Sequence, residues 1–214
     1  MQKSALIAGS TGLVGSELLR YLLDSKEYES VTAIVRKPLH ITHPKLKEFI
    51  VDFEKLHEFE DVFKVNDVFC CLGTTIKKAK TKEAMTRIDV EYPLVMAKLA
   101  KKMGAKQFLV ISAMQANPNS STFYSRIKGE MEQELRKVGF DALHVFRPSL
   151  LVGDRKEFRL GEKSAEILFK ALFFVFIGPL KKYKAIHAKT VASGMLKAAQ
   201  SEKQGVNVYL SDEI

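Results

Sequence analysis

Cysteine and tryptophan are the scarcest residue types in this chain of 214 residues. There is no tryptophan, and the only two cysteines, Cys70 and Cys71, are adjacent. Neighbouring side chains on a strand point to opposite faces, so a disulfide framework within the chain is excluded. Free cysteines are typical of a reducing compartment, and the apolar run at residues 5–8 is too short for a secretory signal. We therefore expect a cytoplasmic protein.

Long apolar runs are also missing. The longest, residues 167–180, is interrupted by Lys170 and closed by Gly178 and Pro179. It is shorter than the roughly 20 apolar residues that a membrane-spanning helix needs. No membrane span is expected, and the segment is interpreted as a buried or pocket-lining helix, with a membrane-surface role as the alternative.

Basic residues outnumber acidic ones, and the formal net charge is +9. Lysines are grouped at 77–82, 101–106 and 181–184, and phosphates attract such groups. The groups are dispersed, and no helix-turn-helix, zinc or RNP-like pattern accompanies them, so they are interpreted as solvated faces without a nucleic-acid partner. The five histidines show no ligand spacing with cysteine or carboxylates, so no metal is expected.

Apolar, β-branched runs alternate with segments of helical period along the whole chain. Strands are predicted at 4–9, 31–35, 47–53, 67–73, 106–112, 141–147 and 206–211, and helices at 13–24, 83–103, 123–138 and about 186–200. Most strands are almost continuously apolar, which indicates that both of their faces are covered. The alternation predicts an α/β fold of the Rossmann type, a doubly wound parallel sheet with right-handed crossovers.

Domain boundaries are not marked by any repeat, low-complexity tract or Pro/Gly-rich linker. Residues 1–214 are therefore expected to form a single domain. Residues 150–184 are irregular and contain several glycines, so they are interpreted as a small C-terminal substrate cap, inserted before the last helix and strand.

A glycine motif, G-x-x-G-x-x-G, stands between the first predicted strand and the first predicted helix. Glycines at these positions permit a tight turn, the approach of a ligand to the backbone and close packing of helix on strand. The free N–H groups at the helix N-terminus form an anion site that suits a dinucleotide pyrophosphate. The candidate cofactor-binding residues of this loop are Gly9, Ser10, Thr11, Gly12, Leu13, Val14 and Gly15.

The ends of the next strands add further candidates for cofactor binding. Arg36 and Lys37 follow the second strand, where NAD-selective proteins place an acid. Cations there favour the 2′-phosphate of NADP(H) over NAD(H), with an ordinary basic loop as the alternative. Asp52 and Phe53 end the third predicted strand, and a carboxylate there suits the adenine amino group. Leu72, Gly73 and Thr74 follow the fourth strand at the carboxyl edge, where open sheets bind ligands.

A catalytic group is predicted from three polar residues. Tyr124 and Lys128 are four apart, which places them on one face of a helix, and Ser112 ends the fifth strand at the carboxyl edge. A lysine ammonium within about 4 to 6 Å favours the ionised form of a tyrosine and so fits it for acid–base work. We therefore expect Ser112, Tyr124 and Lys128 to meet over one ligand.

Several blocks of the sequence together resemble the short-chain dehydrogenase/reductase family, in its atypical branch with a shifted glycine motif. The blocks are "GSTGLVG", the pair Arg36 and Lys37, "CCLGTT", "VISA", "YSRIKGEMEQEL" and "FRPSLLVGDRKEFRLGE". The last two resemble in particular the group of the Tat-interacting protein of 30 kDa. They extend the resemblance over nearly the whole chain.

The resemblance implies a role for each matching position. Tyr124 would donate or accept the proton, Lys128 would hold the nicotinamide ribose, and Ser112 would polarise the substrate carbonyl. Thr11, Gly12, Leu13 and Val14 would contact the pyrophosphate, Arg36 and Lys37 the 2′-phosphate, and Leu72 and Gly73 the adenosine side, while Leu151 and Arg159 would close over the cofactor.

The function expected from residues and resemblance together is that of an NADP(H)-dependent oxidoreductase. Hydride transfer to or from a small carbonyl or alcohol would be accompanied by proton transfer at Tyr124. A regulatory protein that binds NADPH without turnover is the main alternative, and a sugar-nucleotide epimerase or dehydratase is a second one. The apolar segment 169–180 favours an apolar small-molecule substrate, and the sequence predicts no oligomeric state.

Overall fold

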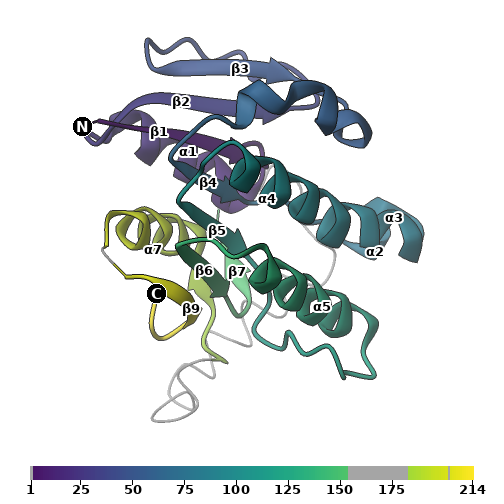
Figure 1. The fold of residues 1–214 in the computed structure, drawn as a ribbon. Coiled ribbons are helices and arrows are strands. Elements are labelled where there is room, and N and C mark those ends of the chain that lie inside the picture. Colours follow the sequence, from purple (N-terminus) through teal and green to yellow (C-terminus); the bar gives the residue numbers. More distant parts are fainter. Residues whose placement is uncertain (1, 154–182, 202) are drawn as a thin grey trace.

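Seven parallel strands form the central sheet of the computed structural model, which describes residues 2–153, 183–201 and 203–214 (Figure 1). In spatial order these are β3 (Leu46–Ile50), β2 (Tyr28–Val35), β1 (Lys3–Ala8), β4 (Asp67–Cys70), β5 (Gln107–Ile111), β6 (Ala142–Arg147) and β9 (Gly205–Leu210). The order reverses at β1, which is the switch point of doubly wound nucleotide-binding sheets. The predicted α/β Rossmann-like fold is confirmed.

Helices cover both faces of this sheet, as Figure 1 shows. One face carries α1 (Leu13–Asp24) and α7 (Ala188–Gln200), and the other carries the 3-10 segment η1 (Phe53–Phe63), α3 (Lys82–Thr86), the π-helical segment η2 (Arg87–Glu91), α4 (Tyr92–Lys102) and α5 (Phe123–Val138). A short α2 (Ile76–Ala79) precedes α3, and β7 (Leu151–Val152) pairs with β8 (Ile186–His187) beside the main sheet.

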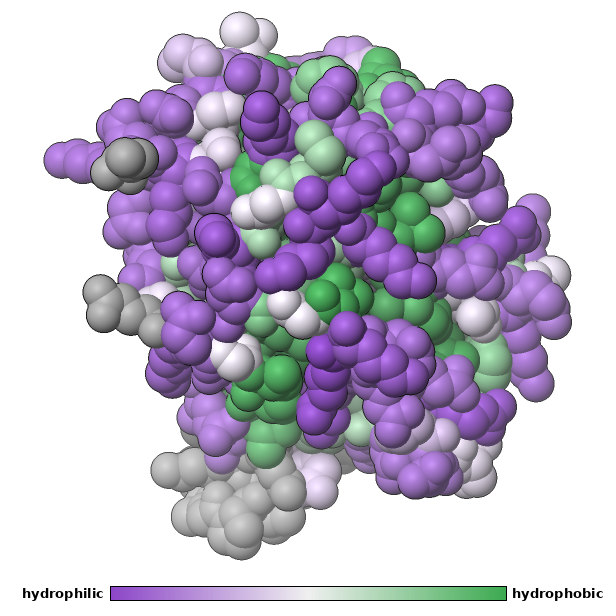
Figure 2. All heavy atoms as spheres, in the orientation of Figure 1, coloured by the Kyte–Doolittle hydropathy of each residue, from purple (hydrophilic) through white to green (hydrophobic). Residues whose placement is uncertain are grey.

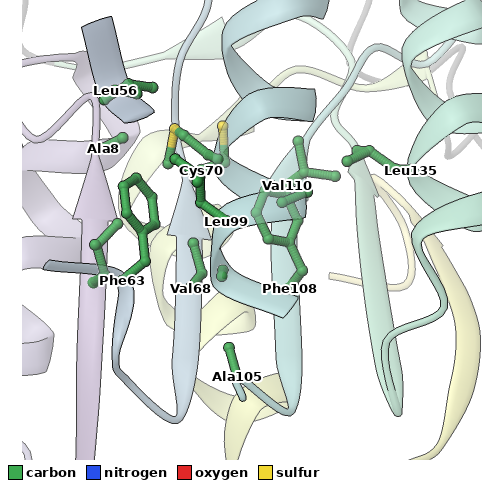
Figure 3. Close-up of a cluster of buried hydrophobic side chains, with 14 of the residues drawn as sticks. Ala8, Leu56, Phe63, Val68, Cys70, Leu99, Ala105, Phe108, Val110 and Leu135 are labelled. Atoms are coloured by element: carbon green, nitrogen blue, oxygen red, sulfur yellow. The ribbon is translucent and has the colours of Figure 1, made fainter. Parts of the chain in front are cut away.

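Alternate side chains of each strand feed two separate cores. Leu6 and Val68 belong to the core under α4 and α5, whereas their neighbours Ile7 and Phe69 belong to the core under α1 and α7. Figure 3 shows the first of these cores, where Phe108 packs with its neighbours between the strands and α4. Burial of apolar area on both faces is the main driving force for this three-layer arrangement.

Some boundaries differ from those predicted. The third and fourth strands end at Ile50 and Cys70, because the chain turns at once into η1 and into the loop before α2. The third strand is an edge strand and is not covered on both faces: Ile50 is 56% exposed. The helix predicted at 83–103 is continuous but contains the π-helical turn η2, which apolar periodicity does not reveal.

The surface is largely polar, as Figure 2 shows for one face, where apolar side chains form small separate patches. The lysine group at 101–106 is partly paired: Lys101 lies 3.2 Å from Asp141 and Lys102 lies 2.6 Å from Glu60. No helix among the described residues is long and apolar enough to cross a bilayer. The predicted cap at 150–184 and its apolar segment 167–180 fall almost entirely outside the described residues.

A buried histidine near the end of the sheet makes stability sensitive to acid. His144 on β6 is fully buried, and its ring nitrogens lie 3.0 Å from the Tyr209 hydroxyl and 3.3 Å from Gln107 Oε1. Burial, with a smaller contribution from Lys203, lowers the pKa of His144 to about 4. The unfolded chain, with a histidine pKa near 6.5, therefore binds more protons below that pH.

We expect folding stability to fall by roughly 2 to 3 kcal/mol between pH 7 and pH 4.5 because of this histidine. Urea unfolding of the wild type and of His144→Gln at both pH values measures the effect. The exposed His57→Gln serves as the control. The same acid-induced loss in His144→Gln as in the wild type would contradict the assignment.

Candidate functional site

The glycine loop after β1 is built on close contacts between backbone segments. Gly9 has a φ of +80°, and a Cβ atom there would lie 2.4 Å from the carbonyl oxygen of Cys71. A Cβ on Gly15 would lie 2.1 Å from the carbonyl oxygen of Gly9. Gly12 differs, because a Cβ there would meet a single atom, the Gly9 carbonyl oxygen at 3.2 Å. Gly9 and Gly15 are therefore required by internal packing, and Gly12 is less tightly constrained.

The N-terminus of α1 has the properties of an anion site. Gly12 is its N-cap residue and provides no side-chain cap, and the first turn contains no acidic residue. The first helical hydrogen bond is Ser16 N–H to the Gly12 carbonyl, which leaves the preceding N–H groups free of helical partners. Ser10 Oγ is buried without a hydrogen-bond partner among the described residues. These free donors fit the pyrophosphate of a dinucleotide.

Arg36 and Lys37 follow β2, which lies beside β1 in the sheet. Both side chains are exposed at the carboxyl edge, next to the glycine loop. Asp52 is exposed at the same edge, but its Oδ1 accepts a hydrogen bond from Glu54 N–H at 3.0 Å and caps η1. Phe53 was expected to contact the cofactor, but its side chain is buried in the core, where its ring centroid lies 5.4 Å from that of Tyr92.

The loop after β4 is held by a buried carboxylate that sequence reasoning missed. Thr74 N–H donates to Asp89 Oδ2 at 3.0 Å, and Asp89 is completely buried on η2. Leu72 and Gly73 precede Thr74 in this loop, and Gly73 is exposed. An acidic residue at a core-facing position of the helix predicted at 83–103 was the available signal.

Lys128 is buried beneath the exposed side chain of Tyr124. Tyr124 is the second residue of α5 and is 39% exposed, one turn before Lys128. Lys128 Nζ lies 2.7 Å from Asp89 Oδ1, and the two side chains are only 3% and 0% exposed. Burial lowers the pKa of Lys128, but the Asp89 carboxylate and the Tyr124 phenol oppose it, so that the pKa ends above the usual lysine value. The site thus holds a buried ammonium next to an accessible phenol.

Ser112 is oriented differently from the expected arrangement. Its hydroxyl donates to Glu132 Oε1 at 2.5 Å, and Ser112 is only 4% exposed. Arg147 binds the same carboxylate through Nε at 2.9 Å and Nη2 at 2.6 Å. The structure therefore brings Tyr124 and Lys128 together, but it directs the proton of Ser112 to Glu132, one turn farther along α5.

The remaining candidates lie beyond this pair. Leu151 is half-buried on β7, and Arg159 lies outside the described residues. A shallow cavity of about 430 Å³ opens beside the first turn of α5, and Tyr124 is not among its lining residues. It is lined by Lys82, Glu83, Thr86, Arg87, Glu91, Phe123 and Arg126. In the described parts of the chain, no three His, Cys, Asp or Glu side chains are grouped to hold a metal ion.

A doubly wound sheet with this glycine loop at the first helix N-terminus defines a nucleotide-binding Rossmann protein. Comparison with known families agrees: a family model described as NAD(P)H-binding matches residues 9–172. The chain belongs to this NAD(P)H-binding family.

Named relatives and solved structures extend the comparison. The chain is 40% identical over 174 residues to rat (Rattus norvegicus) protein HTATIP2, which covers 79% of this chain and 72% of that protein. It is 30% identical over 217 residues to the mitochondrial protein FMP52 of Candida albicans, and the match covers 99% of this chain and 93% of that protein. HTATIP2 belongs to the group that the sequence motifs resemble, so that resemblance is confirmed.

The similar solved structures share the fold at low identity. MoeE5 in complex with UDP-glucuronic acid and NAD has a TM-score of 0.75 at 18% identity, covering 96% of this chain and 75% of MoeE5. The UDP-glucose 4-epimerase of Thermotoga maritima has a TM-score of 0.71 at 16% identity, covering 97% and 76%. These neighbours support the Rossmann fold.

The different environments of the three glycines predict different mutant phenotypes. Gly15→Ala places a Cβ against the Gly9 carbonyl, so we expect it to lower the free energy of unfolding by about 3 kcal/mol or more. Gly12→Ala changes an N-cap residue whose added Cβ would lie 3.2 Å from one atom, a milder contact, so it should cost about 1 kcal/mol or less. It should nevertheless weaken dinucleotide binding, because the new methyl group enters the space above the loop. Urea unfolding and NADPH fluorescence titration measure both effects; equal destabilisation by the two variants would contradict the model of the loop.

Proposed function

We propose that the chain is an NADP(H)-dependent oxidoreductase of the atypical short-chain dehydrogenase/reductase type, acting on a small carbonyl or alcohol. One observation supports this most strongly: an exposed phenol, Tyr124, stands over a fully buried ammonium, Lys128, on the helix after β5. The carboxyl ends of the strands form one edge of the sheet, so this pair and the glycine loop belong to the same edge. A protein that only bound a dinucleotide would need no proton donor there.

The cofactor would be held by groups that the structure leaves available. The free N–H groups after Gly12 and the buried Ser10 hydroxyl would bind the pyrophosphate. Arg36 and Lys37 would bind the 2′-phosphate, since a guanidinium can bind a phosphate through two hydrogen bonds. When bound, the nicotinamide would supply or accept a hydride at the substrate carbon.

Tyr124 would move the proton that accompanies this hydride. Its hydroxyl would donate to the carbonyl oxygen in reduction and accept the proton of an alcohol in oxidation. The Lys128 ammonium below it would stabilise the tyrosinate form and hold the nicotinamide ribose through a hydrogen bond. The Ser112 hydroxyl now donates its hydrogen bond to Glu132. It would polarise the carbonyl only after it turns away from Glu132 and donates to the substrate oxygen instead.

Two further expectations stay predictions. A regulatory protein that binds NADPH without turnover is the alternative, because fold does not decide function. The predicted cytoplasmic location is the other; the names of several fungal relatives, including that of Candida albicans, place those proteins in the mitochondrion.

Replacement of the proposed proton donor is the first test. Tyr124→Phe keeps the ring but removes the hydroxyl, so we expect turnover to fall by about 100-fold or more. NADPH binding should stay within about twofold, because the ring and the glycine loop are unchanged. The assay follows NADPH oxidation with a panel of aldehydes, ketones and quinones. Tyr21→Phe, which alters a half-buried tyrosine in the last turn of α1, at the end of that helix away from the glycine loop, is the matched control.

Unchanged turnover in Tyr124→Phe would contradict the assignment of the proton donor. If the wild type binds NADPH but reduces no member of the panel, the non-catalytic alternative takes its place.

Cofactor preference is tested at the end of β2. Replacing Arg36 with Asp and Lys37 with Ser removes two cations and adds one negative charge, so NADPH affinity should fall by roughly 10- to 100-fold. NADH affinity should change little, since NADH lacks the 2′-phosphate. The absence of tryptophan leaves nicotinamide fluorescence free of indole emission and makes this titration direct. Equal weakening of both dinucleotides would reject the 2′-phosphate role.

A further inference from the structure

Lys128 is an ammonium in a place that disfavours charge. Its side chain is 3% exposed, and a buried lysine without a counter-charge tends to lose its proton. The ionisable groups that influence Lys128 come from three elements: Cys70 on β4, Asp89 on η2 and Tyr124 on α5. Burial raises the pKa of the Cys70 thiol to about 11, so this group is neutral at physiological pH. Asp89 is thus the carboxylate among the groups around Lys128.

Asp89 lies in a segment with an unusual backbone hydrogen-bond pattern. Residues Arg87–Glu91 form a π-helical turn between α3 and α4, and such turns often occur at functional sites. Asp89 is completely buried there, on a surface helix whose other polar residues are mostly exposed. A buried carboxylate is costly unless it is paired, so a specific role for this side chain is the simplest explanation of its retention in the core.

The two oxygens of Asp89 have different partners. Oδ1 lies 2.7 Å from Lys128 Nζ and has no other partner among the described residues. Oδ2 accepts the hydrogen bond from Thr74 N–H at 3.0 Å, in the loop after β4. That loop also carries the Cys71 carbonyl, against which Gly9 of the glycine loop packs. One carboxylate therefore connects the ammonium of α5 to the backbone around the glycine loop.

We propose that Asp89 is a positioning residue of the site: one oxygen keeps Lys128 as an ammonium beneath Tyr124, and the other fixes the loop at Thr74. The inference rests on the proposed function, in which Lys128 serves Tyr124 and the cofactor ribose. Asp89 touches neither of the reacting groups and acts through Lys128 and through the loop.

Removal of the charge of Asp89 makes the proposal testable without a known substrate. Asp89→Asn keeps the shape of the side chain and an oxygen for Thr74 N–H, but it removes the counter-charge of Lys128. Burial then acts on Lys128 unopposed by a carboxylate and should lower its pKa by several units. Lysines labelled with ¹³C at Cε report this directly, because their chemical shift changes when the ammonium loses its proton.

We expect one lysine resonance of Asp89→Asn to titrate between pH 6 and 9, where ordinary lysines do not titrate. The double variant Asp89→Asn/Lys128→Met should lose this resonance, which assigns it to Lys128. Asp67→Asn is the matched control: Asp67 is also a buried carboxylate, but it lies at the other end of the strands, bonded to Tyr28 and 3.4 Å from Lys3. If no lysine titrates in this range in Asp89→Asn, the proposal is overturned.

A second readout connects the charge to cofactor binding. A hydrogen bond from an ammonium is stronger than one from a neutral amine, so NADPH affinity of Asp89→Asn should fall about tenfold on passing from below to above the new titration point. The wild type and Asp67→Asn should show no such step. A titrating Lys128 without any change in NADPH affinity would overturn the functional half of the proposal.

If Asp89→Asn folds poorly at neutral pH, the pH dependence of its thermal unfolding still tests the role of Asp89. A base with a pKa that is lower in the folded than in the unfolded state gains stability as pH rises, since the unfolded chain then binds more protons. The melting temperature of Asp89→Asn should therefore rise from pH 6 to pH 9, and that of Asp89→Asn/Lys128→Met should not. Parallel pH profiles would overturn the proposal. A wild type that binds no NADPH would instead reject the proposed function, and the lysine titration would still decide the role of Asp89.

Discussion

The contact between backbone atoms at Gly9 is the constraint on which the rest of the site depends. With no side chain at Gly9 or Gly15, the first turn of α1 lies against the end of β1, and β1 lies against the loop after β4. This close packing points the N-terminus of α1 at the carboxyl edge of the sheet, where its free N–H groups are available to an anion. It also fixes the loop at Cys71, and through Thr74 that loop meets the buried carboxylate of Asp89. The N-terminus of α1 and the Asp89–Lys128 pair are therefore connected through the backbone of these two loops.

Two buried ion pairs follow each other along the inner face of α5. Lys128 pairs with Asp89, and one turn later Glu132 binds Arg147 and Ser112. Desolvation makes buried pairs weak sources of net stability, although the loss of one partner is costly because a lone charge remains. Such pairs do restrict how a helix can sit, because each charge must meet its partner. We interpret them as fixing the rotation and position of α5 on the sheet, and thereby the place of Tyr124.

The sequence was sufficient for the seven strands of the main sheet and for the position of the glycine loop, because both depend on local rules. Strands β1, β2, β5 and β6 and helices α1 and α5 begin and end close to their predicted residues, since apolar period and turn residues mark them. The partners of the buried charges could not be predicted in this way. Asp89 meets Lys128 across 39 positions of the chain, and the π-helical turn that carries it leaves no mark in apolar periodicity. The core position of the Phe53 side chain was missed for a related reason: a strand end and the start of a core-packed 3-10 segment look alike in sequence.

The structural neighbours share the Rossmann sheet with this chain. A shared sheet does not by itself imply shared chemistry. At 16–18% identity, MoeE5, solved with UDP-glucuronic acid and NAD, and the Thermotoga maritima epimerase share only the fold with this chain. What this chain does depends on its own side chains at the carboxyl edge. The Ser112 hydroxyl donates its hydrogen bond to Glu132, and Tyr124 presents an exposed hydroxyl from the first turn of α5 at this edge. Tyr124 stands one turn before Lys128 on the same helix, and a charged Lys128 in the core requires a carboxylate beside it. Asp89 is that carboxylate, 2.7 Å from Lys128, so the ground beneath the exposed phenol is a buried ion pair.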